Sequence, residues 1–154
     1  MTLCTDCYIQ QNGKTLMLYR NKKKNDINKG KWIGLGGKFE HGESPEQCLV
    51  REVREEAGVT LTDYRLRGIV TFTVTDDISE PLYLFIYTAS KYIGEIRECD
   101  EGSLQWIDDD KIIDLDLWEG DKLFWDWILN TDKFFSASFI YSGTGLIKHQ
   151  VALY

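Results

Sequence analysis

The spacing of apolar and polar residues predicts a chain built mainly from β-strands. Residues 3–10 alternate loosely, and residues 15–20 follow Asn12-Gly13, a dipeptide typical of a two-residue hairpin. Residues 32–40 are apolar but broken by glycines, which we interpret as a kinked strand closely approached by another group. The later strands are expected at residues 64–75, 81–92, 103–107, 134–141 and 146–153, the last two forming a terminal hairpin.

Two segments have helical periodicity. The first begins at Ser44-Pro45, a cap residue followed by a favoured first helical residue, and ends before Gly58. The second covers residues 121–130. The stripe expected to be buried on the first helix consists of Leu49, Val50, Val53 and Ala57. With a helix on each side of a mixed sheet, we expect one domain over residues 1–154, of α/β (α+β) class, built as an α/β/α sandwich.

Charge and composition exclude several classes of protein. The 154 residues carry a formal net charge of −7, which does not favour binding to a nucleic-acid backbone. The longest apolar run, residues 82–87, is far below the ~20 residues of a membrane span, and we see no signal peptide. Four cysteines are too few for a disulfide scaffold, so a reducing, cytoplasmic setting is expected. Cys4 and Cys7 would face opposite sides of their strand, which argues against a metal or redox pair.

A cluster of acids on the first helix is the main candidate for chemistry. Glu52, Glu55 and Glu56 stand at i, i+3 and i+4, so they lie on one arc and repel one another. Of the neighbouring arginines, only Arg51 can reach back to Glu55. The alternative is a solvated charged face. A hard divalent cation, Mg²⁺ or Mn²⁺, fits such a cluster better.

The spacing around these acids distinguishes the two interpretations. Gly37 is followed after five residues by Glu43, and after seven more by Arg51-Glu52-Val53-Arg54-Glu55-Glu56-Ala57-Gly58-Val59. This pattern resembles the complete signature of the Nudix hydrolase family. The resemblance implies Mg²⁺-dependent hydrolysis of a nucleoside diphosphate linked to another group, with Arg51 holding the glutamates. The metal ligands it implies are Gly36 and Gly37 through the backbone, and Glu52, Glu55, Glu56 and Glu101. Glu52 is either a ligand or a base that orients water, and the choice of base stays open.

Outside this signature, the chain resembles the MutT-like hydrolases of oxidised purine nucleoside triphosphates. Trp118 matches an aromatic that stacks on the base, and Asp121 matches an acid that reads the purine edge, with Glu119 as its rival. A carboxylate is an acceptor-only group that can take both the N1–H and the 2-amino donors of guanine. Alternatively, Trp118 is part of the core and Asp121 caps the second helix. The candidate substrate-binding residues are Lys23, Lys38, Phe72, Trp118, Glu119 and Asp121.

The resemblance is incomplete in two places. Ile33 stands where the vertebrate enzymes have asparagine, and Gly120-Asp121 stands where they have two adjacent acids. Cys48 is interpreted as a small residue that lets the loop with Gly37 come close, and the lysines of residues 22–31 as solvated or as steering a polyanion.

The activity implied is cleavage of 8-oxo-dGTP, or a related purine triphosphate, to the monophosphate and pyrophosphate, as in nucleotide-pool sanitation. The expected partner is therefore a small nucleotide, with no nucleic-acid polymer or membrane, and the expected state is a monomer. The alternatives are another nucleoside diphosphate derivative, such as a sugar nucleotide, a dinucleoside polyphosphate or a capped RNA end, and a nucleotide sensor without catalysis.

Overall fold

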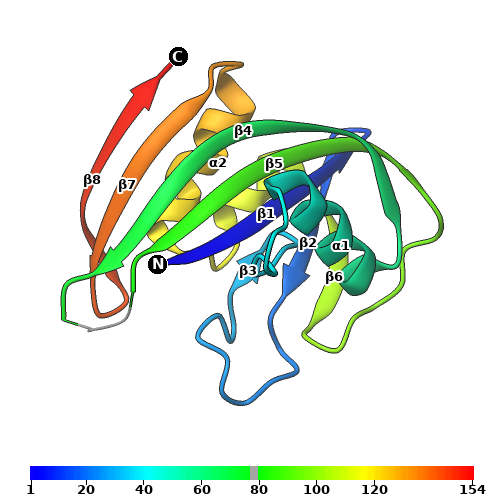
Figure 1. Cartoon of the computed structure of the whole chain (residues 1–154), viewed down its shortest axis with the longest axis horizontal. Coiled ribbons are helices and arrows are strands. Elements are labelled where there is room, and N and C mark those ends of the chain that lie inside the picture. Colours follow the sequence, from blue (N-terminus) through cyan, green and yellow to red (C-terminus); the bar gives the residue numbers. More distant parts are fainter. Residues whose placement is uncertain (77–79) are drawn as a thin grey trace.

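A computed structural model describes residues 1–76 and 80–154 and confirms the expected mixed sheet with a helix on each side. In chain order the elements are β1 (Thr2–Gln11), β2 (Lys14–Tyr19), β3 (Trp32–Ile33), α1 (Pro45–Ala57), β4 (Thr60–Val74), β5 (Leu82–Ile93), β6 (Ser103–Asp108), the 3₁₀ helix η1 (Asp109–Asp114), α2 (Glu119–Asn130), β7 (Phe135–Ser142) and β8 (Gly145–Leu153). Figure 1 shows α1 in front of the sheet and α2 behind it. None of the helices among these described elements is long and apolar enough to cross a membrane.

The sheet runs in the order β3-β2-β1-β5-β4-β7-β8, and β6 also pairs with β2. The neighbours β1 and β5, and also β4 and β7, are parallel, whereas the other pairs are antiparallel. Strands β4 and β5 form the long curved ribbon that arches across Figure 1. Helices α1 and α2 pack on opposite faces of this sheet, so alternate side chains of β1 point toward one helix or the other.

Three local predictions differ from the structure. Within residues 32–40 only Trp32–Ile33 is a strand, because the following segment meets β1 through isolated bridges, Cys4 with Lys38 and Cys7 with Leu35. Helix α2 begins at Glu119 with Trp118 as its cap residue, so the alternative that Asp121 caps this helix is wrong. The 3₁₀ helix η1 was not predicted, since it lacks a clear apolar period.

The start of α1 confirms the sequence prediction. The Ser44 hydroxyl accepts the Gln47 amide, the Gln47 side chain returns to the Ser44 amide, and Pro45 occupies the first turn. Leu49, Val53 and Ala57 are buried as predicted, while Val50 is only half-buried. This capping box fixes where the helix begins and therefore which arc its glutamates occupy.

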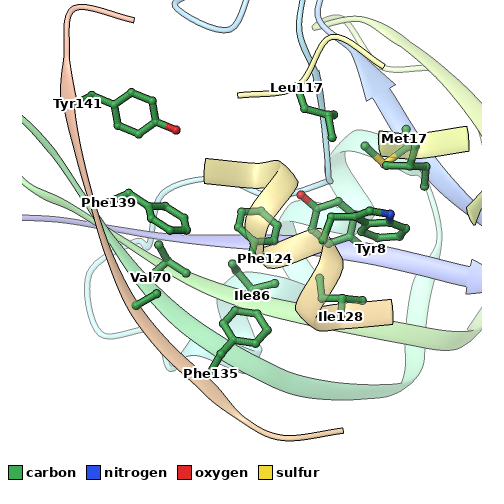
Figure 2. Close-up of a cluster of buried hydrophobic side chains, with 13 residues drawn as sticks. Tyr8, Met17, Val70, Ile86, Leu117, Phe124, Ile128, Phe135, Phe139 and Tyr141 are labelled. Atoms are coloured by element: carbon green, nitrogen blue, oxygen red, sulfur yellow. The ribbon is translucent and has the colours of Figure 1, made fainter. Parts of the chain in front are cut away.

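Two hydrophobic clusters lie on either side of the sheet. The cluster under α2 includes Tyr8, Phe124 and Phe135, as Figure 2 shows, and the cluster under α1 includes Cys7 and Leu49. Neighbouring residues of β1 thus point to opposite clusters, as the period-2 pleat requires. By the same alternation, Asp6 shares the α2 side with Tyr8, whose hydroxyl donates to it over 2.8 Å.

A buried arginine anchors the C-terminal end of α2. Arg67 on β4 is only 5% exposed, and it donates to the carbonyl of Ile128 over 3.1 Å and to that of Thr131 over 2.5 Å. The last turn of α2 has no basic residue of its own. Arg67 therefore satisfies carbonyls at the helix end and places positive charge against the negative end of the helix dipole.

Replacing Arg67 by methionine should lower the free energy of unfolding by about 1.5–3 kcal/mol, the range for hydrogen bonds to charged groups. Denaturant unfolding followed by circular dichroism measures this. Arg65→Met is the control: this neighbour also donates to a carbonyl near the helix end, that of Asp132, but its side chain is 59% exposed. Equal losses for the two variants would contradict the anchoring role of Arg67.

Candidate active site

The glutamates of α1 lie against the glycine segment that follows β3. Glu56 is only 6% exposed, and its Oε2 accepts the Gly36 amide over 3.3 Å. A Cβ atom on Gly37 would lie 2.5 Å from the carboxylate carbon of Glu52. This close packing explains the requirement for glycine, because any side chain at residue 37 would displace Glu52. Cys48 lies beneath the same segment, with its thiol 3.6 Å from the Gly37 carbonyl, which agrees with its predicted role as a small spacer.

Arg51 connects the acids to one another. Its guanidinium contacts Glu43 at 2.5 and 3.0 Å, Glu52 at 2.8 Å and Glu55 at 3.3 Å. The contact with Glu55 is the one that helical spacing predicted. Arg51 also donates to the Lys38 carbonyl over 3.0 Å, which ties the helix to the glycine segment. The bonds from Arg51, together with the Glu40 amide, lower the pKa of Glu43 to about 2, so Glu43 remains an ionised anchor.

Glu101 joins this cluster from the loop before β6. Its carboxylate contacts Arg20 at 2.5 Å and Lys23 at 3.4 Å. Burial, together with the charges of Glu101 and Glu52, raises the pKa of Glu56 to about 9. Burial likewise raises the pKa of Glu52, although Arg51 opposes this and Glu55 and Glu101 add to it. The charges of these acids thus act on one another's pKa values, which is expected of carboxyls that lie in one cluster. The four are Glu52, Glu55, Glu56 and Glu101.

The donor set suits a divalent cation. Among residues 1–76 and 80–154, no three acidic, histidine or cysteine side chains converge in a geometry already suited to a metal, since Arg51 and Arg20 hold most of the carboxylates. Glu56 differs because no arginine holds its carboxylate: in the part of the chain that the structure describes, the Gly36 amide is the one hydrogen-bond donor to it. A buried carboxyl surrounded by other acids is stabilised by a cation. The Gly37 carbonyl accepts the Thr5 amide over 2.9 Å, so Gly36 is the better backbone candidate.

The outer surface of α1 beside the cluster is open. A hollow of about 550 Å³ is lined by Arg51, Arg54, Glu55 and Tyr64 together with Glu46, Gln47 and Val50. Glu55, whose side chain is 58% exposed, faces solvent here, in contrast to Glu52 and Glu56. Glu52, Glu56 and Glu101 are not among the lining residues, so this hollow borders the carboxylate cluster at Arg51 and Glu55 without enclosing it.

Trp118 is held in a fixed orientation at the start of α2. Its indole N–H donates to the Asn28 side chain over 2.8 Å, and the Lys31 ammonium lies 5.1 Å from its ring centroid. The ring also meets Tyr141 edge-on, with centroids 6.0 Å apart. Trp118 is half-buried against the α2 cluster, so it contributes to the core and also retains an exposed portion.

Asp121 lies on the first turn of α2 and is largely buried. It is 7% exposed, and burial raises its pKa well above the ordinary value, with a further contribution from the charge of Asp6. Lys31 acts in the opposite direction. Lys31 thus lies over the Trp118 ring and its charge also acts on Asp121, so all three residues lie around the start of α2.

The other predicted substrate-binding residues are more scattered. Phe72 packs on Phe139 and Tyr141, Lys38 and Glu119 are exposed, and Lys23 contacts Glu101. Of these, only Lys23 is brought into direct contact with a predicted metal ligand.

Three polar residues at the site were not singled out from the sequence as site residues. Arg20 binds Glu101 and Asp26, and Asn28 binds Trp118. Asp6 is 7% exposed on β1, and burial raises its pKa to about 7 despite the hydrogen bond from Tyr8. The available signal was an acid inside an otherwise apolar strand, which marks a buried polar group. Arg20 and Asn28 gave no such signal, because a polar residue is ordinary at the end of a strand, as Arg20 is, and in a loop, as Asn28 is.

Comparison with known proteins agrees with this geometry. The chain matches the NUDIX domain family over residues 2–128. It is 35% identical over 132 residues to the oxidized purine nucleoside triphosphate hydrolase of Danio rerio, covering 86% of this chain and 82% of that protein. It is 32% identical over 141 residues to the Nudix hydrolase YvcI of Bacillus subtilis, covering 90% of this chain and 85% of that one.

A solved structure with a similar fold covers almost the whole chain. The crystal structure of a MutT protein from Bacillus halodurans superposes with a TM-score of 0.88 and 28% identity, covering 98% of this chain and 97% of that one. The match therefore includes the C-terminal hairpin as well as the glutamate helix. From its signature on α1, its sheet and these relatives, the chain belongs to the Nudix family and is a Nudix hydrolase.

Proposed function

We propose that this hydrolase cleaves 8-oxo-dGTP, or a related purine nucleoside triphosphate, to the monophosphate and pyrophosphate with Mg²⁺, or Mn²⁺ in its place. The observation that carries the proposal is the segment between β2 and β3, which contacts both halves of the site. Lys23 meets Glu101 beside the carboxylates, and Asn28 meets Trp118 beside the base residues. One nucleotide could therefore place its phosphates at α1 and its base at α2.

The phosphate half of the site would be formed by the carboxylate cluster. Glu52, Glu55, Glu56 and Glu101, with the Gly36 carbonyl, would hold the metal, and Glu52 is either a ligand or the group that orients water. Bound there, Mg²⁺ would neutralise phosphate charge and make a bound water more acidic. Arg51 would keep the glutamates in place through its bonds to Glu43, Glu52 and Glu55. Lys23 and Lys38 would add local positive charge in a protein of net charge −7.

The base half would be formed at the start of α2. The face of Trp118 would stack on the purine, since its edge is fixed by Asn28 and by Tyr141. The Asp121 carboxyl would accept the N1–H and 2-amino donors of a guanine-type base. Glu119, exposed on the same turn, is the rival for this contact, and Phe72 would help to form the apolar wall next to Tyr141.

We further propose that the protein acts as a cytoplasmic monomer on free nucleotides, and so removes oxidised precursors before they enter DNA. Its four cysteines are free thiols, which suits a reducing compartment.

A product assay tests the function directly. With Mg²⁺ present, 8-oxo-dGTP and dGTP should yield pyrophosphate with a higher kcat/KM than dCTP, and excess chelator should abolish turnover without lowering the melting temperature. A sugar nucleotide and a dinucleoside polyphosphate complete the panel. If the protein hydrolyses only the sugar nucleotide or the dinucleoside polyphosphate, the proposed substrate is wrong and the enzyme acts on another class of nucleotide. If it binds nucleotides but forms no product, it is a sensor.

Glu56→Gln should lower kcat by about 10²-fold or more, because the amide cannot lose a proton to bind the metal as the most buried carboxyl of the cluster would. It should also weaken Mn²⁺ binding, measured by titration without nucleotide. The fold should persist, since the amide has the same shape and carries no buried charge. Glu80→Gln is the control, because Glu80 pairs with the N-terminal amine and its side chain is 67% exposed. Normal turnover and Mn²⁺ affinity in folded Glu56→Gln would contradict the metal assignment.

Asp121→Ala should lower kcat/KM for guanine-type substrates by about tenfold or more, because an unpaired polar group at a binding surface costs about 1–3 kcal/mol. The kcat at saturation should change little, since the phosphates are held elsewhere. Asp126→Ala is the control, an exposed acid of the same helix that bonds only to Asn130 in the described contacts. An equal decrease in kcat/KM for dGTP, 8-oxo-dGTP and dCTP would show that Asp121 does not recognise the base.

A further inference from the structure

Two acids from distant parts of the sequence are buried together on the α2 side of the sheet. Asp6 from β1 and Asp121 from α2 are each only 7% exposed. Of the charges that act on Asp121, Asp6 has the largest effect, and Tyr8 is affected by both carboxyls. Tyr8 itself is packed against Phe124 and Trp125 of α2, with ring centroids 6.0 and 5.4 Å apart. Asp121 stands three and four residues before these two rings, on the same face of α2, so Asp6 and Asp121 lie near each other between β1 and the first turns of α2.

The protein supplies few polar partners for this pair. One oxygen of Asp6 accepts the Tyr8 hydroxyl over 2.8 Å, and the other lies against Gly34, where any Cβ atom would collide with it. The neighbouring Cys7 amide is the other donor that acts on this carboxyl. The hydrogen bonds of the described residues give the Asp121 carboxyl no partner. Lys31 is the nearby cation, but its ammonium contacts Asp116 at 2.7 Å and lies over Trp118.

Such an arrangement is unfavourable for folding. A buried carboxyl without a full set of hydrogen bonds destabilises the protein, and a second carboxyl beside it adds repulsion. Groups of this kind are typical of binding and catalytic sites, where a ligand completes the missing contacts. The missing contacts here are N–H donors, because a carboxyl offers mainly acceptor oxygens.

We propose that Asp6 is a specificity-determining residue of the base site and reads, beside Asp121, the N–H donors on the edge of a guanine-type purine. This inference rests on the proposed function, since it assigns a second residue to the same base site. Trp118 and Lys31 border the site on the α2 side, and β1 carries Asp6 to it from the sheet side. The base would stack on Trp118 and direct its polar edge between the two acids. Tyr8 acts as a positioning residue, because its hydroxyl fixes the orientation of the Asp6 carboxyl.

Asp6→Asn tests the proposal with little change in shape. The substitution turns one acceptor oxygen into an N–H₂ donor, which would face the donors of the base. We expect about a tenfold lower kcat/KM for dGTP and 8-oxo-dGTP, in line with one lost or opposed hydrogen bond, and an unchanged kcat/KM for dCTP. The kcat at saturating substrate should stay the same. The melting temperature should hold or rise, because the variant removes a buried acid from beside another.

A second measurement depends on neither the metal nor turnover. Binding of dGMP in excess chelator, followed by calorimetry, reads the base site alone, and Asp6→Asn should weaken it by the same factor. Tyr8→Phe should weaken it less, since the carboxyl remains but loses its orienting bond. Asp109→Asn is the matched control, an acid that accepts the Thr15 hydroxyl over 2.6 Å beyond the β1–β2 hairpin, and it should change neither dGMP affinity nor base preference.

The outcomes separate this inference from the proposed function. Unchanged dGMP affinity and base preference in Asp6→Asn, in a wild-type protein that hydrolyses purine triphosphates, would overturn the role of Asp6 and leave the function intact. A different pair of results would support the role of Asp6 and overturn the proposed function. In that case Asp6→Asn binds dGMP more weakly than the wild-type protein does, and the wild-type protein forms no pyrophosphate from any triphosphate. Absence of dGMP binding by the wild-type protein would overturn the inference, as would an equal loss for dGTP and dCTP accompanied by a lower melting temperature.

Discussion

The close approach of the glycine segment after β3 to strand β1 organises both halves of the site. A Cβ atom on Gly36 would collide with the Thr5 carbonyl, and one on Gly37 would collide with the Glu52 carboxylate. The same segment accepts the Thr5 and Cys7 amides through the carbonyls of Gly37 and Leu35. On one side this segment contacts Glu52 and Glu56 of α1, and on the other Gly34 lies against Asp6 of β1, whose side chain points to the α2 side of the sheet. Any side chain on these glycines would separate the strand from the acids of α1.

Concentrated negative charge is the second constraint, and the protein balances it locally. The acids of α1 are bonded through Arg51, and Glu101 is bonded through Arg20 and Lys23. These cations hold the carboxylates near one another, whereas the hydrogen bond that the described residues give to Glu56 comes from the Gly36 amide. The long loop between β2 and β3 supplies Lys23 for one half of the site and Asn28 for the other. The orientation of Trp118 and the position of Glu101 therefore depend on the same loop.

Core packing and buried acidic groups oppose each other in stability on the α2 side. The aromatic cluster there, which includes Phe124, Phe135 and Phe139 (Figure 2), provides apolar burial that stabilises the fold. The same layer contains the buried acids Asp6 and Asp121, whose raised pKa values reflect their loss of water. The apolar burial of this cluster offsets the cost of burying two acids, which leaves them available for the base recognition that we propose.

The sequence by itself determined the glutamate helix, its cap and the nature of the fold. Periodicity and capping are local properties, so α1, the β1–β2 hairpin and the mixed sheet followed from residues near one another in the chain. The spacing from Gly37 to Val59 likewise identified the acids of α1 and the reach of Arg51 to Glu55. Tertiary structure alone decided which residues from distant segments meet. It brought Glu101 to Arg20, Asn28 to Trp118, and Asp6 to Asp121, and it made residues 34–40 an irregular segment instead of a strand. These outcomes depend on how β1 packs between two helices, and a long-range contact of that kind leaves no periodic signal in the residues that form it.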